Sequence, residues 1–333
     1  MTTSHSSPVT SVPDHRTILA AIQLACRAPS VHNTQPWRWL FDGTRLHLYA
    51  DIDRCLTSAD PNARQLVISC GAALHHARTA FAAHGWHTDT DRMPDPAQPW
   101  YLATIEFRPW PDPPPGIAER ARAIDHRHTD RLPMLEPHGF ARILPELRML
   151  TSPHDVELDV LDDDARQRIA AASDHSAATR RYDMMYQTEL HWWAGHRDMP
   201  EGIPPNALPS DAESAHVDVA RAFPSMAHST RRAALDDRSR LVVLSSASES
   251  TLAWLHTGEA LSAVLLACTA AGLATCALTH ITELPTGRTT IAGFLPHPTL
   301  PQVVIRVGSS PDDTEPPPTP RRAVIEVYTE RRT

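Results

Sequence analysis

Two alanine-rich segments, separated by 187 positions (258 − 71), constrain the fold of this chain more than any other feature of its sequence. They read CGAALHHARTAFAAHGW (70–86) and TGEALSAVLLACTAAGL (257–273). The identical residues at this spacing are Gly71 and Gly258, Ala73 and Ala260, Leu74 and Leu261, Ala80 and Ala267, Ala83 and Ala270, and Gly85 and Gly272. Alanine-rich helices can match by chance, but a repeat of this kind predicts one folding unit that occurs twice.

The sequence around the two segments supports a duplication. An alternating apolar run precedes each segment, at 45–51 and at 156–162, and a strand-like run follows each, at 101–107 and at 302–308. Alternation with a period of two indicates strands that bury one face. Each copy therefore combines strands with a long helix.

The boundary between the copies lies in RPWPDPPPGIAE (108–119), where four proline residues occur within five positions. Because proline cannot continue a helix or a central strand, this stretch predicts a connection. We predict a first half at 13–115 and a second half at 116–333. Helices are predicted over 13–28, 62–84 and 251–273, and strands of the second half near 156–161 and 241–246.

The segment 182–232 has no counterpart of similar character in the first half. It is rich in Met, Trp, Pro and His. A connection of this length inside a compact domain is usually functional. A disordered insert is the alternative, but the tryptophan and methionine residues favour packing against the rest of the protein. We therefore predict a lid at about 182–232.

Composition excludes several functions. The net charge of −8 offers no electrostatic basis for binding nucleic acid. The sequence contains no lysine, which excludes a Schiff-base lysine and a P-loop lysine. Five cysteines without a CxxC motif and a polar N-terminus predict a reduced, cytoplasmic protein. The uncharged stretch 261–278 favours a buried helix over a membrane span.

Motifs for other cofactors are missing. No GxGxxG, GxxxxGK[ST], GxSxG or HExxH pattern occurs. Among the 20 histidines, His84 and His87 have a helical ligand spacing, but no third ligand is evident near them. We therefore predict no metal site.

Three short stretches carry polar side chains in an unusual setting. In APSVHNTQPW (28–37), small and amide side chains stand between proline and tryptophan. In DHRHTDR (125–131), two arginines and a threonine alternate and would point to one side of an extended chain, which suits a phosphate monoester. PPPTPRR (316–322) presents two arginines after a stiff, proline-rich approach. Taken alone, each stretch also fits a helix cap, a satisfied loop or a solvated charge cluster.

Together these stretches resemble the FMN-dependent nitroreductase family, in particular its single-chain, tandem Acg-like branch. APSVHNTQPW is similar to the family's PSxxN element, and the other two stretches are similar to its RxSxR and C-terminal Arg elements. The family builds its flavin site across a dimer interface, and here the first element lies only in the first half and the others only in the second. The resemblance, which covers about 13–325, implies an α+β nitroreductase fold. In it, two tandem halves form a pseudo-dimer, each with a mixed or antiparallel sheet flanked by helices, and one FMN binds per chain.

The resemblance also implies roles for individual residues. Arg127 and Thr129 would bind the phosphate or ribityl group, and Arg131 would approach the flavin N1/O2 edge, where a cation stabilises the reduced flavin. A loop at 275–280 would pass the N5 edge, with Thr279 where many members have an acidic residue. The implied cofactor-binding residues are Pro29, Ser30, Val31, His32, Asn33, Gln35, Arg127, Thr129, Arg131, Ala277, Leu278, Thr279, Arg321 and Arg322.

The implied activity is ping-pong hydride transfer from NAD(P)H through FMN to a nitroaromatic or quinone. In that case no side chain need act as a nucleophile, because the flavin carries the chemistry. The alternative is a flavin-sequestering, storage or redox-sensing protein whose closed lid permits little turnover. A related flavin chemistry, such as reductive dehalogenation or flavin fragmentation, also stays open. The expected partner is a small-molecule electron acceptor. The chain is expected to be a monomer (a pseudo-dimer) or a weak homodimer, away from membranes.

Overall fold

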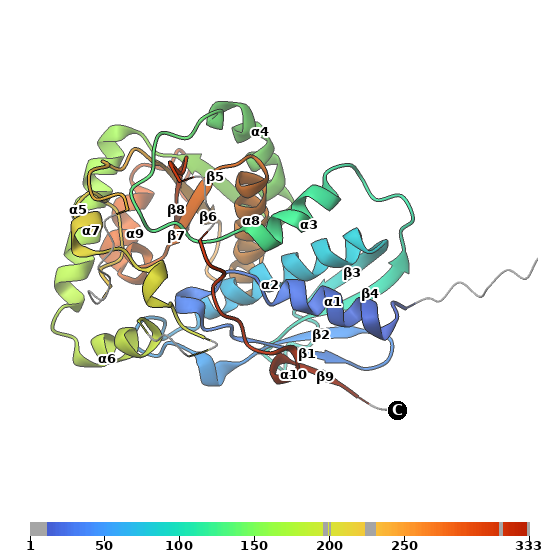
Figure 1. Cartoon of the computed structure of the whole chain (residues 1–333). Coiled ribbons are helices and arrows are strands. Elements are labelled where there is room, and N and C mark those ends of the chain that lie inside the picture. The colour runs from blue at the N-terminus through green and yellow to red at the C-terminus, as the bar shows by residue number, and fades with distance from the viewer. Residues whose placement is uncertain (1–11, 196–198, 200, 224–230, 313–315, 332–333) are drawn as a thin grey trace, which may run out of the picture.

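The chain folds into two β-sheets that lie on either side of a central pair of long helices (Figure 1). This computed structural model describes residues 12–195, 199, 201–223, 231–312 and 316–331. Sheets and helices are segregated, which confirms the predicted α+β class.

The first sheet has the strand order β3-β4-β2-β1-β9. All neighbours are antiparallel except β1 and β9, so this sheet is mixed. Its last strand comes from the C-terminal end of the chain, far from the others in sequence. The strands are β1 (Trp37–Phe41), β2 (Leu46–Ala50), β3 (Trp86–Arg92), β4 (Tyr101–Pro109) and β9 (Tyr328–Glu330).

The second sheet has the order β5-β6-β8-β7 and is antiparallel throughout. When the strands are counted in chain order within the sheet, this order is first, second, fourth, third. Strands β1, β2, β4 and β3 of the first sheet lie side by side in the same order. The strands are β5 (Val156–Val160), β6 (Arg240–Ser246), β7 (Ala274–Leu278) and β8 (Leu300–Gly308).

Helices cover the sheets and form the layer between them. The α-helices are α1 (His15–Ala25), α2 (Arg64–Ala83), α3 (Ile117–His126), α4 (Phe140–Thr151), α5 (Asp163–Arg180), α6 (Met184–Trp193), α7 (Asp211–Ser214), α8 (Thr251–Ala270), α9 (Pro285–Ala292) and α10 (Val324–Val327). The 3-10 turns are η1 (Val31–Asn33), η2 (Ile52–Arg54), η3 (Ser152–His154), η4 (Pro205–Ala207) and η5 (Ile281–Glu283).

The central pair consists of α2 and α8, the two alanine-rich segments of the repeat. Ser250 caps α8, because its hydroxyl accepts a hydrogen bond from the Ala253 amide. By length and composition α8 could cross a membrane, but 72% of its most apolar stretch is buried inside the protein. It is therefore packed as a core helix, as its sequence predicts.

The two helices cross at the matched glycines. A Cβ atom on Gly71 would lie 2.1 Å from the Leu255 carbonyl oxygen, and one on Gly258 would lie 2.0 Å from the Ile68 carbonyl oxygen. These contacts are reciprocal, because Ile68 and Leu255 are again 187 residues apart (255 − 68). The close contacts are therefore the same in both directions between the two helices.

Alanine at either glycine is expected to destabilise the protein strongly and equally. Neither helix can retreat without disturbing a packed core, so we expect Gly71→Ala and Gly258→Ala each to cost about 3 kcal/mol or more. Urea unfolding measures this cost. Gly293→Ala is the control, because its Cβ would come no closer than 3.5 Å to another atom. A loss below 1 kcal/mol at Gly71 would contradict the close crossing.

The structure corrects two sequence expectations. Residues 275–278, expected in a loop, belong to the buried strand β7. The segment 182–232 is not all loop, since α6 and α7 lie within it. Parts of that segment (196–198, 200 and 224–230) lie outside the described residues.

Candidate functional site

A pocket lies where α2, α8, β7 and the 201–223 segment meet. It encloses about 900 Å³ of space that no protein atom fills, counting the solvent at its mouth. Residues from early, middle and late parts of the chain line it, so the pocket exists only once both sheets are assembled. Pockets that combine apolar walls with a few polar groups are typical ligand sites.

The stretch APSVHNTQPW forms one wall, and its backbone is unusual. His32, Asn33 and Gln35 have φ angles of 47°, 57° and 51°, in the left-handed region that non-glycine residues rarely occupy. Ser30 holds this conformation, because its hydroxyl accepts a hydrogen bond of 3.0 Å from the Gln35 amide. Ser69 of α2 accepts from the Val31 amide at 3.2 Å. Strained backbone of this kind, roughly 1 kcal/mol or more per residue, is concentrated at functional sites.

Nine of the fourteen expected cofactor-binding residues line the pocket. They come from η1 and the residues before it, from the 127–131 stretch, and from β7 with the residue that follows it. They are Pro29, Ser30, Val31, His32, Thr129, Arg131, Ala277, Leu278 and Thr279.

Three expected residues brace the wall from behind instead of lining it. The Asn33 amide group donates to the carbonyls of Gly202 (2.9 Å) and Pro320 (3.0 Å). The Gln35 side-chain oxygen accepts from the Arg322 amide at 2.8 Å. The Arg322 guanidinium donates to the Gln35 carbonyl and lies 3.7 Å from Asp51. The Arg322 guanidinium is therefore occupied in bracing the wall.

The remaining two, Arg127 and Arg321, lie together at the C-terminal end of α1. Both donate to the Arg27 carbonyl oxygen at 3.2 Å, and Arg321 also donates to Cys26. Carbonyls at a helix C-terminus attract cations. Within the described ranges, however, neither guanidinium has a carboxylate partner. Burial, together with the neighbouring arginines, lowers the pKa of Arg127 to about 9 and that of Arg321 to about 10.

Arg131 brings a further positive charge to the pocket wall. Its guanidinium lies over the Phe223 ring at 5.5 Å and donates to the Ala207 carbonyl at 3.2 Å. Burial lowers its pKa. As at Arg127, the described part of the chain supplies no carboxylate to pair with it.

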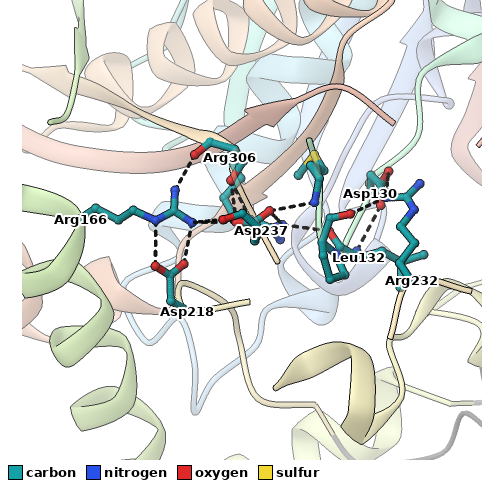
Figure 2. A network of polar contacts seen from close by, with 10 residues as sticks. Asp130, Leu132, Arg166, Asp218, Arg232, Asp237 and Arg306 are labelled. Atoms are coloured by element: carbon teal, nitrogen blue, oxygen red, sulfur yellow. Dashed lines mark hydrogen bonds and ion pairs between the residues drawn. The ribbon is translucent and has the colours of Figure 1, made fainter. Parts of the chain in front are cut away.

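A network of buried charges fixes the stretch that carries Thr129 and Arg131 (Figure 2). Arg232 pairs with Asp130 at 2.9 Å, and Arg306 of β8 donates to the Leu132 carbonyl at 2.9 Å. Asp237 in turn binds Arg306. Burial by itself would raise the pKa of Asp237, but the charge and hydrogen bonds of Arg306 outweigh it, and the pKa is lowered.

Sequence reasoning missed a second polar group at the pocket, centred on Arg221. Its guanidinium pairs with Glu283 and donates to the Tyr186 hydroxyl at 2.5 Å and to the Thr279 hydroxyl at 3.4 Å. Thr279 in turn donates to Gln65 of α2. Arg221 carries no sequence signal because it lies in an irregular segment. Gln65 and Ser69 could have been found as polar residues four apart, and so on one face, in the apolar first half of α2.

His32 is the least satisfied group in the pocket. It is 6% exposed, and neither ring nitrogen has a partner among the described residues. Burial, aided by the charges of Arg221 and Arg131, lowers its pKa well below the usual value, so the imidazole is neutral at pH 7. A ligand in the pocket could meet one free donor and one free acceptor here.

The described residues contain no group of three His, Cys, Asp or Glu side chains placed to hold a metal ion. All five cysteines, which lie in the described ranges, are free.

Comparison with known proteins identifies the family. No protein-family model matches the chain. The protein named provisionally as NAD(P)H nitroreductase Acg of Mycobacterium tuberculosis (strain ATCC 25618 / H37Rv) is 45% identical over 313 residues, which cover 93% of this chain and 95% of that protein. A second provisionally named NAD(P)H nitroreductase of that strain, Rv3131, is 35% identical over 324 residues, or 96% of this chain and 92% of that protein.

Solved structures add only distant likenesses. The FMN-dependent nitroreductase NfnB of Mycobacterium smegmatis, solved in complex with NADPH, is 15% identical and covers 64% of this chain and 98% of its own, with a TM-score of 0.40. The structure of a provisionally named nitroreductase from Anabaena variabilis matches over 90% of both chains at 11% identity, with a TM-score of 0.34. Because these TM-scores lie below 0.5, family membership rests on the sequence relatives.

The protein has an α+β fold, with a strained PSxxN-type wall and arginines around one pocket. It also has relatives of this identity over nearly its whole length. These features together define a nitroreductase-type protein. The chain belongs to the NAD(P)H nitroreductase family, which confirms the family that its sequence resembles.

Proposed function

We propose that the chain binds one FMN in this pocket and works as an NAD(P)H-dependent oxidoreductase. The observation that carries the proposal is the pair Arg127 and Arg321. Both guanidinium groups bind the Arg27 carbonyl, two residues before the pocket-lining Pro29, and no described carboxylate neutralises them. Uncompensated buried charge is costly, and a phosphate monoester would offset it through charge-assisted hydrogen bonds. Bound FMN would supply two-electron transfer from NAD(P)H to a nitroaromatic or quinone, in a ping-pong cycle.

The pocket also suits a flavin ring. Its walls are mostly apolar, while His32 offers unmet hydrogen-bonding atoms and Arg131 offers a positive charge. A cation next to a ring that becomes anionic on reduction stabilises the reduced state. Arg221, held by Glu283, fixes the Thr279 hydroxyl at the end of β7.

The repeat supports a pseudo-dimer with halves at 13–115 and 116–333. The two sheets share one strand order, and the glycine contacts between α2 and α8 are reciprocal. Strand β9 of the second half then completes the sheet of the first, as an exchanged arm would. A chain that contains both halves needs no second copy to complete the pocket, so we infer a monomer. We further propose that it works in the cytoplasm on a small-molecule electron acceptor.

We further propose that the segment 182–232 is a lid. Its described residues Ile203, Arg221 and Phe223 line the pocket. Among the contacts that hold it to the body, Arg221 pairs with Glu283 and Arg54 pairs with Glu201. The Glu189 carboxylate also accepts from the Ser58 and Ala59 amides at 3.1 and 3.0 Å. The nicotinamide would reach the flavin face only after this segment moves.

Anaerobic stopped-flow spectroscopy tests the function. Purified protein should show a flavin spectrum at one equivalent per chain. NADPH or NADH should bleach the flavin band, and a quinone added afterwards should restore it. Flavin that dithionite bleaches but neither nicotinamide does would replace the proposal by the storage or sensing alternative. A protein that binds no FMN would overturn the cofactor assignment.

A matched variant tests the lid. Glu189→Ala removes one anchor without touching the pocket, so we expect faster bleaching by the nicotinamide at unchanged FMN content. Glu157→Ala, at an exposed position of β5, is the control. Equal bleaching rates in Glu189→Ala and wild type would refute the gating role.

A further inference from the structure

Strand β8 carries a fully buried arginine, Arg306, that lines the pocket. Every residue of β8 except the first is buried, and Arg306 is the only charged side chain in the strand. Strand β7 pairs with β8 so that Cys276, another pocket-lining residue, lies directly opposite Arg306. Side chains of directly opposite residues share one face of a sheet. An apolar side chain is the usual occupant of such a position, so the charge requires a physical reason.

One nitrogen of the Arg306 guanidinium is unpaired, whereas the other two are occupied (Figure 2). Nε donates to Asp237 at 3.2 Å and to the Ser239 hydroxyl at 3.3 Å. Nη2 donates to Asp237 at 2.6 Å and to the Leu132 carbonyl at 2.9 Å. Nη1 is buried and has no partner among the described residues. An unpaired buried donor is costly, because it has given up its hydrogen bonds to water.

Arg131 and Arg306 differ in charge balance at this end of the pocket. Burial raises the pKa of the Cys276 thiol, and the positive charges of Arg306 and Arg131 oppose that rise. Both guanidinium groups therefore lie near the same pocket-lining thiol. Asp237 neutralises Arg306, but no described carboxylate pairs with Arg131. Arg131 thus brings net positive charge, and Arg306 brings a hydrogen-bond donor whose charge is already balanced.

We propose that Arg306 is a ligand-binding residue of the pocket, and that its Nη1 donates a hydrogen bond to a carbonyl oxygen of the flavin ring. The inference rests on the proposed function, because it takes the ligand to be FMN. A neutral carbonyl suits a donor whose charge is balanced, whereas an anionic phosphate is drawn to Arg127 and Arg321, which lack a described carboxylate. The ring gains negative charge on reduction, so this hydrogen bond also stabilises the reduced flavin.

Flavins that carry sulfur in place of one carbonyl oxygen test the proposal. Sulfur is a much weaker acceptor than oxygen, so wild type should bind FMN about tenfold or more tightly than one of the analogues 2-thio-FMN and 4-thio-FMN. In Arg306→Met the preference over that analogue should disappear, because no donor remains. Equilibrium dialysis of the apo protein measures the three affinities. A general loss of affinity cancels in their ratios, so a purely structural effect would not change them.

Arg166→Met is the matched control. Arg166 pairs with Asp237 at 2.8 Å, as Arg306 also does, but it is not one of the pocket-lining residues. This variant should keep the wild-type preference for FMN. Two outcomes would overturn the proposal: equal preferences in wild type and Arg306→Met, or loss of the preference in both variants.

Asp237 would keep three partners in Arg306→Met, so we expect this variant to fold. They are Arg166, the Met134 amide and the Ser239 hydroxyl. If it does not fold, Arg306→Lys keeps a charge beside Asp237 but has a single nitrogen, so the preference should again be lost. Full preference in Arg306→Lys would then overturn the proposal.

The outcomes for wild type separate this inference from the proposed function. A wild type that binds one FMN per chain but prefers it over neither analogue contradicts only the role of Arg306. A wild type that binds no flavin contradicts the proposed function, and the role of Arg306 with it.

Discussion

Replacing Arg127 and Arg321 together by methionine is expected to abolish tight binding of FMN while leaving the protein folded. Each charge-assisted hydrogen bond to a phosphate contributes about 1.5–3 kcal/mol, so losing one from each arginine should weaken binding by roughly 10²- to 10⁴-fold. Riboflavin lacks the phosphate, and its affinity should change little. The ratio of the two affinities, measured by flavin fluorescence, therefore isolates the phosphate contact.

The same variant should be at least as stable as the wild type without flavin. Arg127 is 8% exposed and has no described carboxylate partner, so in the apo protein its charge is buried at a cost that methionine avoids. Arg45→Met, at an exposed ion pair with Glu106, is the control and should affect neither property. Full retention of FMN in the double variant would show that the phosphate lies elsewhere.

The matched segments predicted the central helix pair because the match depends on few, specific residues. Gly71 and Gly258 match in sequence, and the structure places them where the two helices touch. Strands with strong alternation, such as β2 and β5, were also recognised. Strand β3, with the sequence WHTDTDR, was not, because it lies at a sheet edge and buries only Thr88. An edge strand need not be apolar, so its sequence resembles a loop.

The pocket was predicted in part for a similar reason. Short motifs identified the wall at 29–32 and the residues Thr129 and Arg131. They could not separate side chains that line the pocket from those that brace it, such as Asn33, because both kinds are polar and both follow the same pattern. Arg221 and Phe223 reach the pocket through tertiary contacts of an irregular segment, and no local periodicity marks such residues.

Acid is expected to unfold this protein at a mild pH because several histidines are buried in the neutral form. Burial is the main cause that lowers their pKa values, to about 4 at His154, to about 3 at His75, and well below the usual range at the others. The five are His32, His75, His76, His154 and His280. In the unfolded chain they take up protons below about pH 6.5, but in the folded protein they do not. Stability is therefore present above pH 6.5 and is lost as the pH falls toward the folded pKa values.

At pH 5.5 the expected loss of unfolding free energy is about 1.4 kcal/mol for each such histidine. The five losses together are a large part of a typical total of 5–15 kcal/mol. Asp60 opposes the loss, because burial raises its pKa to about 6 and it gains a proton in the folded state first. Urea unfolding between pH 7.5 and 5 measures the slope. His76→Leu removes a fully buried ring and should reduce the proton uptake on unfolding by about one. His175→Leu, at an exposed position of α5, should leave it unchanged, and equal slopes in both variants would contradict the neutral state of His76.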